Sequence, residues 1–246
     1  MRIAALADIH GNLEALDVVV ADIRSDPPDM VVCLGDIVGY GASPAECCAI
    51  AKEFADTNIL GNHDAAVAGI LDTGYFNDDA KRSILWTRGV LSDAHLSWLR
   101  GLPYTATHDD VLFSHGSPVD PGAFDYVMYA VDVQRVFLML GDRYRVFLMG
   151  HSHRRFVVSR GMDPDDAILV YYADTVPIDR ERRYIISVGS VGQPRDRDTT
   201  ASYGILDTDK GTYSVKRLKY AIRLAGDKIL KAGLPEWLAY RLTIGV

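Results

Sequence analysis

MVVCLGDIVG, residues Met30 to Gly39, is an apolar run of strand length that ends in a carboxylate between two glycines. Because the run does not alternate with polar residues, it predicts a strand buried on both faces, in a sheet covered by other layers. Such a strand presents its last side chain, here Asp36, at the carboxyl edge of the sheet. Gly35 and Gly39 lack side chains, so a ligand or another backbone segment can approach Asp36 closely. Gly-Asp often follows a strand only because both residues favour turns. The residues at the other strand ends therefore decide whether this edge of the sheet carries a functional site.

The composition is that of an ordinary globular protein. The chain has 246 residues, of which 48% are hydrophobic and 24% charged, and one domain over residues 1–246 is expected for an α/β protein of this length. No apolar run approaches the roughly 18 residues that a membrane span needs, so we expect no membrane partner. The first predicted strand reaches Asp8 and leaves no room for a cleavable signal sequence, which predicts a cytoplasmic protein.

Charge and cysteine content exclude several classes of function. The formal net charge of −7 disfavours non-specific binding to nucleic acid, because the protein repels phosphate backbones at long range. A phosphate-bearing substrate therefore needs a local positive centre, which bound metal ions could supply. The three cysteines lack metal-ligand spacing and are interpreted as buried apolar residues in a reducing compartment: Cys33, Cys47 and Cys48.

Polar side chains recur where predicted strands end. The strands expected at 2–8, 30–36, 57–60, 111–114 and 145–149 all run directly into residues that can bind metal or move protons. This pattern is typical of an α/β sheet that collects its site at one edge. Five of the seven histidines lie in these positions, and the whole set is Asp8 and His10, Asp36, Asn62 and His63, His115, and His151 and His153.

The remaining chain divides into a helical and a strand-rich part. Ser43 and Glu46 form a predicted capping box with Pro44 at the first helical position. Residues 65–104 are expected to be helical and to lie beside the site. Beyond residue 153, short runs separated by turn signals predict mostly antiparallel strands, so an α/β first half is followed by an α+β-like second half. Helices are expected near 13–24, 44–56, 131–140, 221–232 and 235–242, and later strands near 156–159, 168–172, 183–188, 202–206 and 212–218.

The ordered set Asp-x-His, Gly-Asp, Gly-Asn-His-Asp, His and Gly-His-x-His, from Asp8 to His153, resembles the calcineurin-like metallophosphoesterase superfamily. The segments Gly35–Gly41 and Gly189–Arg195 are similar to its small prokaryotic phosphodiesterase branch. The resemblance implies a four-layer αββα sandwich in which two mixed β-sheets are flanked by helices. It also implies hydrolysis of small phosphodiesters, nucleotide derivatives or dinucleoside polyphosphates.

The same resemblance implies roles for individual residues. One metal ion would be held by Asp8, His10 and His153. A second would be held by Asn62, His115 and His151. Asp36 would bridge the two ions, and a hydroxide shared by them would attack phosphorus. His63 would act as general acid for the leaving oxygen, and Asp64 would orient it.

The identity of the metal follows from the ligand types. Imidazole and carboxylate together suit divalent transition ions better than Ca²⁺ or Mg²⁺, and the absence of thiolates argues against a structural zinc site. We expect two ions, Mn foremost, with Fe, Zn or Ni as alternatives.

Departures from the family pattern narrow the range of expected substrates. Protein phosphatases carry Asp-Arg where this chain has Gly39-Tyr40, so a phosphoprotein substrate is disfavoured. Tyr40, Gln193 and Arg195 are the expected substrate contacts, with Tyr75 and Phe76 as further candidates. Two other classes of function are disfavoured. A non-catalytic scaffold of the same fold usually lacks part of the ligand set, and a nuclease would need a basic stripe that this chain lacks. A homo-oligomer is compatible with the sequence.

Overall fold

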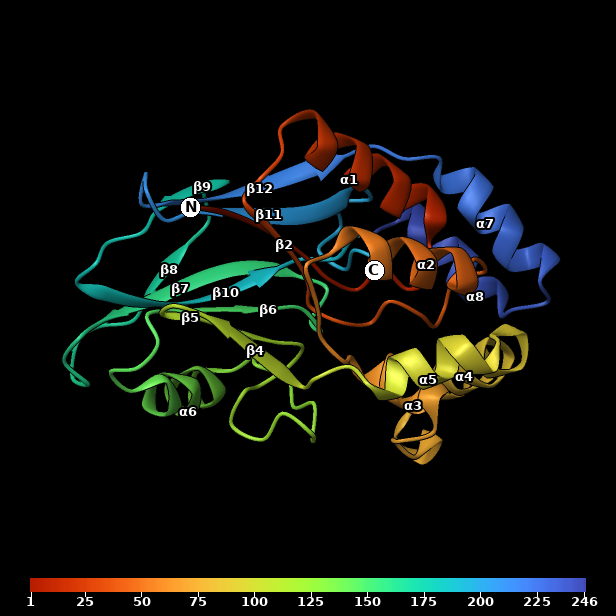
Figure 1. Ribbon diagram of the computed structural model, residues 1–246, viewed down its shortest axis with the longest axis horizontal. Coiled ribbons are helices and arrows are strands. Elements are labelled where there is room, and N and C mark those ends of the chain that lie inside the picture. The colour runs from red at the N-terminus through yellow and green to blue at the C-terminus, as the bar shows by residue number, and fades with distance from the viewer.

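The computed structural model describes residues 1–246 and contains two six-stranded sheets packed face to face, with helices on their outer faces (Figure 1). The first sheet comprises β1 (Arg2–Leu6), β2 (Met30–Cys33), β3 (Thr57–Asn58), β9 (Thr175–Pro177), β11 (Ala201–Asp207) and β12 (Thr212–Leu218). The second comprises β4 (Thr105–His108), β5 (Val111–Ser114), β6 (Val146–Met149), β7 (Arg155–Gly161), β8 (Leu169–Tyr171) and β10 (Arg182–Val188).

Both sheets are mixed. The first has the order β3-β2-β1-β11-β12-β9, in which β1, β2 and β3 pair in parallel and β11 is antiparallel to β1. The second has the order β4-β5-β6-β10-β7-β8, in which β5, β6 and β10 are parallel and β7 is antiparallel to β10. The helices are α1 (Leu13–Ser25), α2 (Pro44–Phe54), α3 (Asn62–Ala68), α4 (Asp78–Val90), α5 (Asp93–Arg100), α6 (Ala130–Leu140), α7 (Ile222–Lys231) and α8 (Glu236–Tyr240), with short 3₁₀ turns at Thr73–Tyr75 and Arg241–Thr243.

The strands β2, β5 and β6 are largely apolar because both of their faces are covered. In β1, Ile3 and Ala5 belong to the core between the sheets, whereas Ala4 and Leu6 pack in the core that includes α1 and α2. On the other side of the molecule, α6 packs on the outer face of the second sheet. Figure 1 shows these four layers, with α1 and α6 on opposite outer faces. The predicted αββα sandwich is confirmed.

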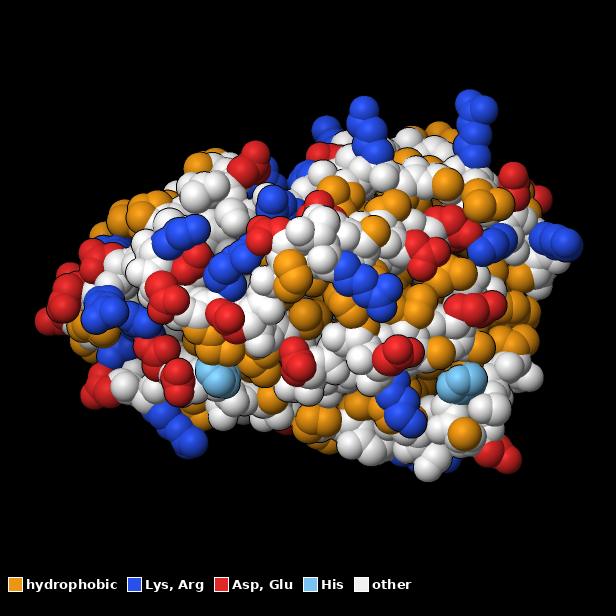
Figure 2. Space-filling model, turned by 45° about the horizontal axis from the view of Figure 1, so that its top comes forward, with side chains coloured by type: hydrophobic (Ala, Val, Ile, Leu, Met, Phe, Trp, Pro, Cys, Tyr) orange, Lys and Arg blue, Asp and Glu red, His pale blue; other side chains and the backbone are white.

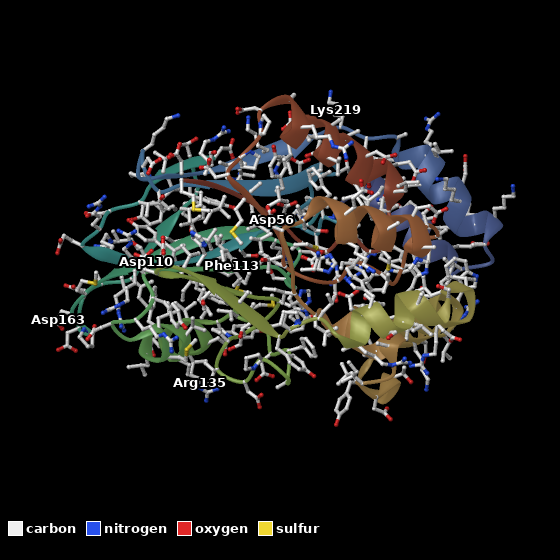
Figure 3. All side chains as sticks on the ribbon, viewed as in Figure 1. Asp56, Asp110, Phe113, Arg135, Asp163 and Lys219 are labelled. Carbon is white, nitrogen blue, oxygen red and sulfur yellow. The ribbon has the colours of Figure 1, made fainter.

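Single residues show the same layering. The ring of Phe113 in β5 lies in the core between the sheets and is completely buried, whereas Arg135 of α6 and Lys219 after β12 point outward (Figure 3). The three cysteines are free and buried, as expected. No helix has both the length and the apolar character needed to cross a membrane.

Several local predictions differ from the structure. Helix α2 begins at Pro44 as predicted, but the side chain of Ser43 makes no capping hydrogen bond, and the helix ends at Phe54 because Ala55 is extended. Helix α3 begins already at Asn62, so Asn62 and His63 lie in the first turn of a helix. The short strands β4 and β9 lie at sheet edges and were not predicted. The residues of β4, Thr-Ala-Thr-His, lack the apolar run by which the other strands of this sheet were recognised.

Candidate metal centre

The polar strand ends meet at one edge of the sandwich. Asp8 and His10 follow β1, Asp36 follows β2, His115 follows β5, and His151 follows β6. In Figure 1 the strands fill one half of the molecule, and α2 to α5, α7 and α8 lie at the other. The carboxyl ends of parallel strands from both sheets therefore supply the site, which is the predicted arrangement.

The backbone turns sharply at the ligand positions. Asp8, His10, Asp36, His151 and His153 have φ angles of 54°, 50°, 54°, 66° and 56°. Residues other than glycine rarely adopt this left-handed region, and such conformations persist only where the surrounding structure holds them. In a strand, side chains two residues apart point to the same face but start about 6–7 Å apart, and these turns let them converge on one point.

Seven polar side chains form two clusters that share one member. Asp36 belongs to both, and within each cluster the candidate ligand atoms lie within 4.8 Å of one another. The amide oxygen of Asn62 joins the second cluster, 3.1 Å from Nε2 of His115. The first cluster contains Asp8, His10, Asp36 and His153, and the second contains Asp36, His115 and His151.

Backbone carbonyls orient three of the imidazole rings. The Nδ1 atoms lie 3.1 Å from the carbonyl oxygen of Val38 for His10, 2.8 Å from that of Leu34 for His115, and 2.7 Å from that of Gln193 for His153. Because a carbonyl only accepts, Nδ1 carries a proton, and Nε2 is directed into the site. This is the arrangement in which histidine binds metals.

Two independent observations indicate that this geometry suits metal ions. Nε2 of His10 and Nε2 of His153 face each other at 3.1 Å. With both lone pairs directed inward this contact is repulsive, and a cation between the two atoms would make it favourable. Two further buried atoms, Oδ2 of Asp8 and Nε2 of His151, have no hydrogen-bond partner. Unsatisfied buried groups are costly, so these two atoms also fit the binding of a cation.

Burial and mutual charge set the protonation of the site. Burial raises the pKa of Asp8 to about 7. Burial also opposes charge on Asp36 and His115, but their attraction prevails, so the pKa of Asp36 lies below its ordinary value and that of His115 rises to about 9. His10, His151 and His153 have pKa values well below the ordinary one because they are buried. They are neutral and ready to bind a metal at pH 7.

His63 lies at the wall of the site rather than among the clustered ligand atoms. Its ring centroid is 4.8 Å from that of His10 and 4.4 Å from that of Tyr40, and its edge contacts Phe76. The Nδ1 atom has no partner. Burial lowers the pKa of His63 to about 4, so the ring is neutral at pH 7 unless a bound anion raises that value.

Asp64 forms no hydrogen bond with the ring of His63, which differs from the predicted orienting role. One carboxylate oxygen accepts a hydrogen bond from the backbone of Val38 at 3.0 Å and the other from that of Gly61 at 3.1 Å. At the third position of α3, the carboxylate points back to the start of the helix and caps it. Asp64 therefore joins the turn after β2 to the helix that carries His63.

A cavity of about 630 Å³ opens beside the two clusters. Aromatic side chains form much of its wall, among them Tyr75, which is 86% exposed. The ring of Tyr126 stacks on His151 at a centroid distance of 3.9 Å. Tyr126 and Phe124 were not singled out in the sequence, because they lie in the loop between β5 and α6, where no pattern predicts which side chains face the site. The lining residues include His63, Phe76, Phe124, Tyr126, His151 and Arg195.

The three expected substrate contacts occupy different places. Tyr40 and Arg195 line the cavity, whereas Gln193 does not. Gln193 is buried, and its side-chain oxygen accepts hydrogen bonds from Nε and Nη2 of Arg195 at 3.2 and 2.7 Å. Gln193 therefore positions Arg195 instead of facing the cavity.

Comparisons with known proteins agree with this geometry. A family model described as the calcineurin-like phosphoesterase superfamily domain matches residues 1–211. An uncharacterised protein of Methanocaldococcus jannaschii is 38% identical over 249 aligned positions, which cover 99% of this chain and 98% of that protein. A symmetrical bis(5'-nucleosyl)-tetraphosphatase of Sodalis glossinidius is 28% identical over 101 residues, covering 40% of this chain and 36% of that protein.

A solved structure shares the complete architecture. The crystal structure of a metallophosphoesterase from Sphaerobacter thermophilus matches with a TM-score of 0.84 at 33% identity, and the match covers 100% of both chains. The chain belongs to the calcineurin-like phosphoesterase superfamily, whose members are hydrolases that act on phosphoesters.

Proposed function

We propose that the protein hydrolyses small phosphodiesters, nucleotide derivatives among them, at a centre of two divalent transition-metal ions. The observation that carries this proposal is the pair of clusters that share Asp36. A complete ligand set argues against a scaffold that has lost turnover.

The two ions would be held by separate side chains and one shared carboxylate. Asp8, His10 and His153 would hold the first, Asn62, His115 and His151 the second, and Asp36 both. Mn is the foremost candidate, with Fe, Zn or Ni as alternatives, because the donors are imidazole and carboxylate. When bound, such a pair of ions binds phosphoryl oxygens and lowers the pKa of a coordinated water.

His63 is the proposed general acid. It lies in the cavity wall beside His10, with Nδ1 buried against Gly39, so Nε2 is the ring nitrogen that can face a substrate. A phosphoester anion in the cavity would raise the pKa of His63 from its low value and so favour the protonated ring. Tyr40 and Phe76 pack around the ring and shield it from water.

The cavity supports a substrate with an aromatic group. Its aromatic wall and its volume of about 630 Å³ are suited to stacking a nucleobase beside the clusters. Dinucleoside polyphosphates are the second candidate class, favoured by the partial match to the symmetrical bis(5'-nucleosyl)-tetraphosphatase.

The surface argues against nucleic-acid polymers as substrates. Figure 2 shows Lys and Arg side chains interspersed with Asp and Glu on the face that it presents, rather than gathered in a stripe. With a net charge of −7, such a surface offers no track for a phosphate backbone.

The test uses purified protein stripped of metal and reloaded with Mn²⁺. Hydrolysis of bis(4-nitrophenyl) phosphate should require the metal and stop on addition of chelator. His63→Ala should lower kcat by about 10²- to 10⁴-fold, the usual contribution of general acid–base catalysis. Metal content by elemental analysis should stay that of the wild type, because His63 is not among the clustered ligand atoms.

A matched control separates this effect from the loss of any histidine. His108 lies in β4 outside the site and its side chain is 37% exposed, so His108→Ala should keep full activity. Full activity in His63→Ala would remove the general-acid assignment. No hydrolysis by the metal-loaded wild type would overturn the proposed function.

A further inference from the structure

Two arginines from distant parts of the chain lie against one tyrosine of the site. The guanidinium carbon of Arg195 and that of Arg241 are each 5.8 Å from the centroid of the Tyr40 ring. Arg195 belongs to the loop between β10 and β11, and Arg241 to the turn that follows α8. Arg241 is not among the substrate contacts expected from the sequence.

Neither arginine forms an ion pair with an Asp or Glu side chain, and Arg241 is held by Val246, the last residue of the chain. The side chain of Arg195 donates to the amide oxygen of Gln193, and Nε of Arg241 donates to the backbone oxygen of Val246 at 2.6 Å. Three other partly buried arginines of this protein are neutralised by acidic partners. These ion pairs are Arg155 with Asp174, Arg183 with Asp142, and Arg217 with Asp196.

The two positive charges oppose each other. Burial, together with the charge of Arg195, lowers the pKa of Arg241 to about 10, so the Arg241 side chain remains charged at pH 7. Two like charges that are partly withdrawn from water, without an Asp or Glu partner, destabilise the local structure unless an anion lies near them. Guanidinium groups bind phosphate through paired N–H donors, which makes phosphate a fitting anion.

The pair lies next to the proposed reaction centre. The ring of Tyr40 is 4.7 Å from that of His10 and 4.4 Å from that of His63, measured between centroids. Arg195 also lines the aromatic cavity. An anion held beside Tyr40 is therefore close enough to the clusters to be covalently connected to the reacting phosphoryl group.

We propose that Arg195 and Arg241 bind a second, non-reacting phosphate of the substrate, so that the enzyme prefers phosphoanhydride-containing nucleotides over diesters with a single phosphate. This inference rests on the proposed function and specifies its substrate class. Arg241 acts in substrate recognition, with Tyr40 as the surface against which both guanidinium groups pack.

The test compares two substrates in Mn²⁺-loaded protein. Diadenosine tetraphosphate carries additional phosphates, and bis(4-nitrophenyl) phosphate does not. Arg241→Gln should lower kcat/KM for diadenosine tetraphosphate by about 10-fold or more, mainly through KM, as expected when a hydrogen bond to a charged group is lost. The kcat/KM for bis(4-nitrophenyl) phosphate should stay within about 2-fold of the wild type.

Two variants serve as controls. Arg241→Lys keeps the charge and should retain most of the preference, provided that its thermal unfolding matches the wild type. Arg223→Gln removes a positive charge from the exposed face of α7 and should change neither substrate. An equal loss for both substrates in Arg241→Gln, or no loss for either, would overturn the inference while leaving the proposed function intact.

A binding measurement tests the second phosphate site even if the wild type hydrolyses neither substrate. Calorimetry should show that the wild type prefers methylenebisphosphonate to methylphosphonate and that Arg241→Gln reduces this ratio by about 10-fold. An unchanged ratio refutes the second phosphate site, whereas absent hydrolysis by itself refutes only the proposed function.

Discussion

At the scale of single residues, the site is built from groups that oppose one another in the absence of a ligand. Nε2 atoms of His10 and His153 face each other, and the carboxylate of Asp8 has an unpartnered oxygen. Positive φ angles at both histidines add backbone strain. Side chains held in this way are preorganised, so little rearrangement would accompany the binding of a cation.

Metal uptake should depend on pH through two of these residues. With pKa values of about 7 for Asp8 and about 9 for His115, both groups bind protons in the metal-free protein at pH 6. Because a ligand must lose its proton to bind metal, affinity should rise as the pH rises from 6 to 9. The number of protons released should fall from about two at pH 6 to about one at pH 8.

Calorimetric titration with Mn²⁺ in buffers of different ionisation enthalpy measures this proton release. The other histidines of the clusters are already neutral and Asp36 is already ionised, so they should contribute none. Proton release that is the same at pH 6 and pH 8 would contradict the assignment.

At the scale of elements, the site depends on close packing between the turn after β2 and the start of α3. Asp36 accepts a hydrogen bond from the backbone of His63 at 2.8 Å, and Asp64 ties Gly61 to Val38. Gly61 makes this approach feasible, because a Cβ atom there would overlap Asp36. The capped first turn of α3 and the shared carboxylate therefore form one unit.

Gly61→Ala should displace Asp36 and thereby weaken binding of both metal ions. The overlap involves backbone as well as carboxylate atoms, so relief requires a shift of the turn, and we expect a loss of about 1–3 kcal/mol in the free energy of unfolding. Denaturant titration and elemental analysis of the reloaded protein measure the two effects.

Gly89→Ala is the matched control, because Gly89 lies in α4 and a Cβ there meets no atom within 4 Å. This control should be neutral or slightly stabilising, by up to about 1 kcal/mol. Normal metal content in Gly61→Ala would show that the contact between Gly61 and Asp36 is not required.

At the scale of the whole molecule, the sandwich brings ligands from both sheets to one edge. Asp8 and Asp36 follow strands of the first sheet, and His115 and His153 follow β5 and β6 of the second. The apolar core between the sheets therefore sets the distance between the two halves of the site. Its large buried side chains include Phe113, Tyr184 and Tyr213.

Removing a ring from this core should destabilise the fold. Phe113→Ala should lower the free energy of unfolding by about 3–5 kcal/mol through lost burial and the cavity left behind. Arg135→Ala, on the exposed face of α6 (Figure 3), should change it by no more than about 0.5 kcal/mol. Chemical denaturation of both variants tests this, and a small effect at Phe113 would mean that the sheets repack without the ring.

Much of this architecture follows from local sequence patterns. The apolar runs at Arg2–Leu6, Met30–Cys33 and Val146–Met149 predict buried strands. The prediction holds because the sandwich covers each of these strands on both faces. The strand ends carry the ligand residues, and the resemblance to the superfamily gives them their order. The edge strand β4 was not predicted, because a strand held mainly by pairing with a neighbour needs no apolar signature.

The sequence by itself determined the set of candidate ligands, the buried strands that end in them and the family to which they point, because these depend on residue types and short spacings. Only the tertiary structure decided that Asp64 binds backbone rather than His63, that Gln193 holds Arg195, and that Arg241 reaches Tyr40. Tyr40 and Arg241 are separated by most of the chain, and no local pattern encodes their contact. Such contacts exist only once the layers have packed together.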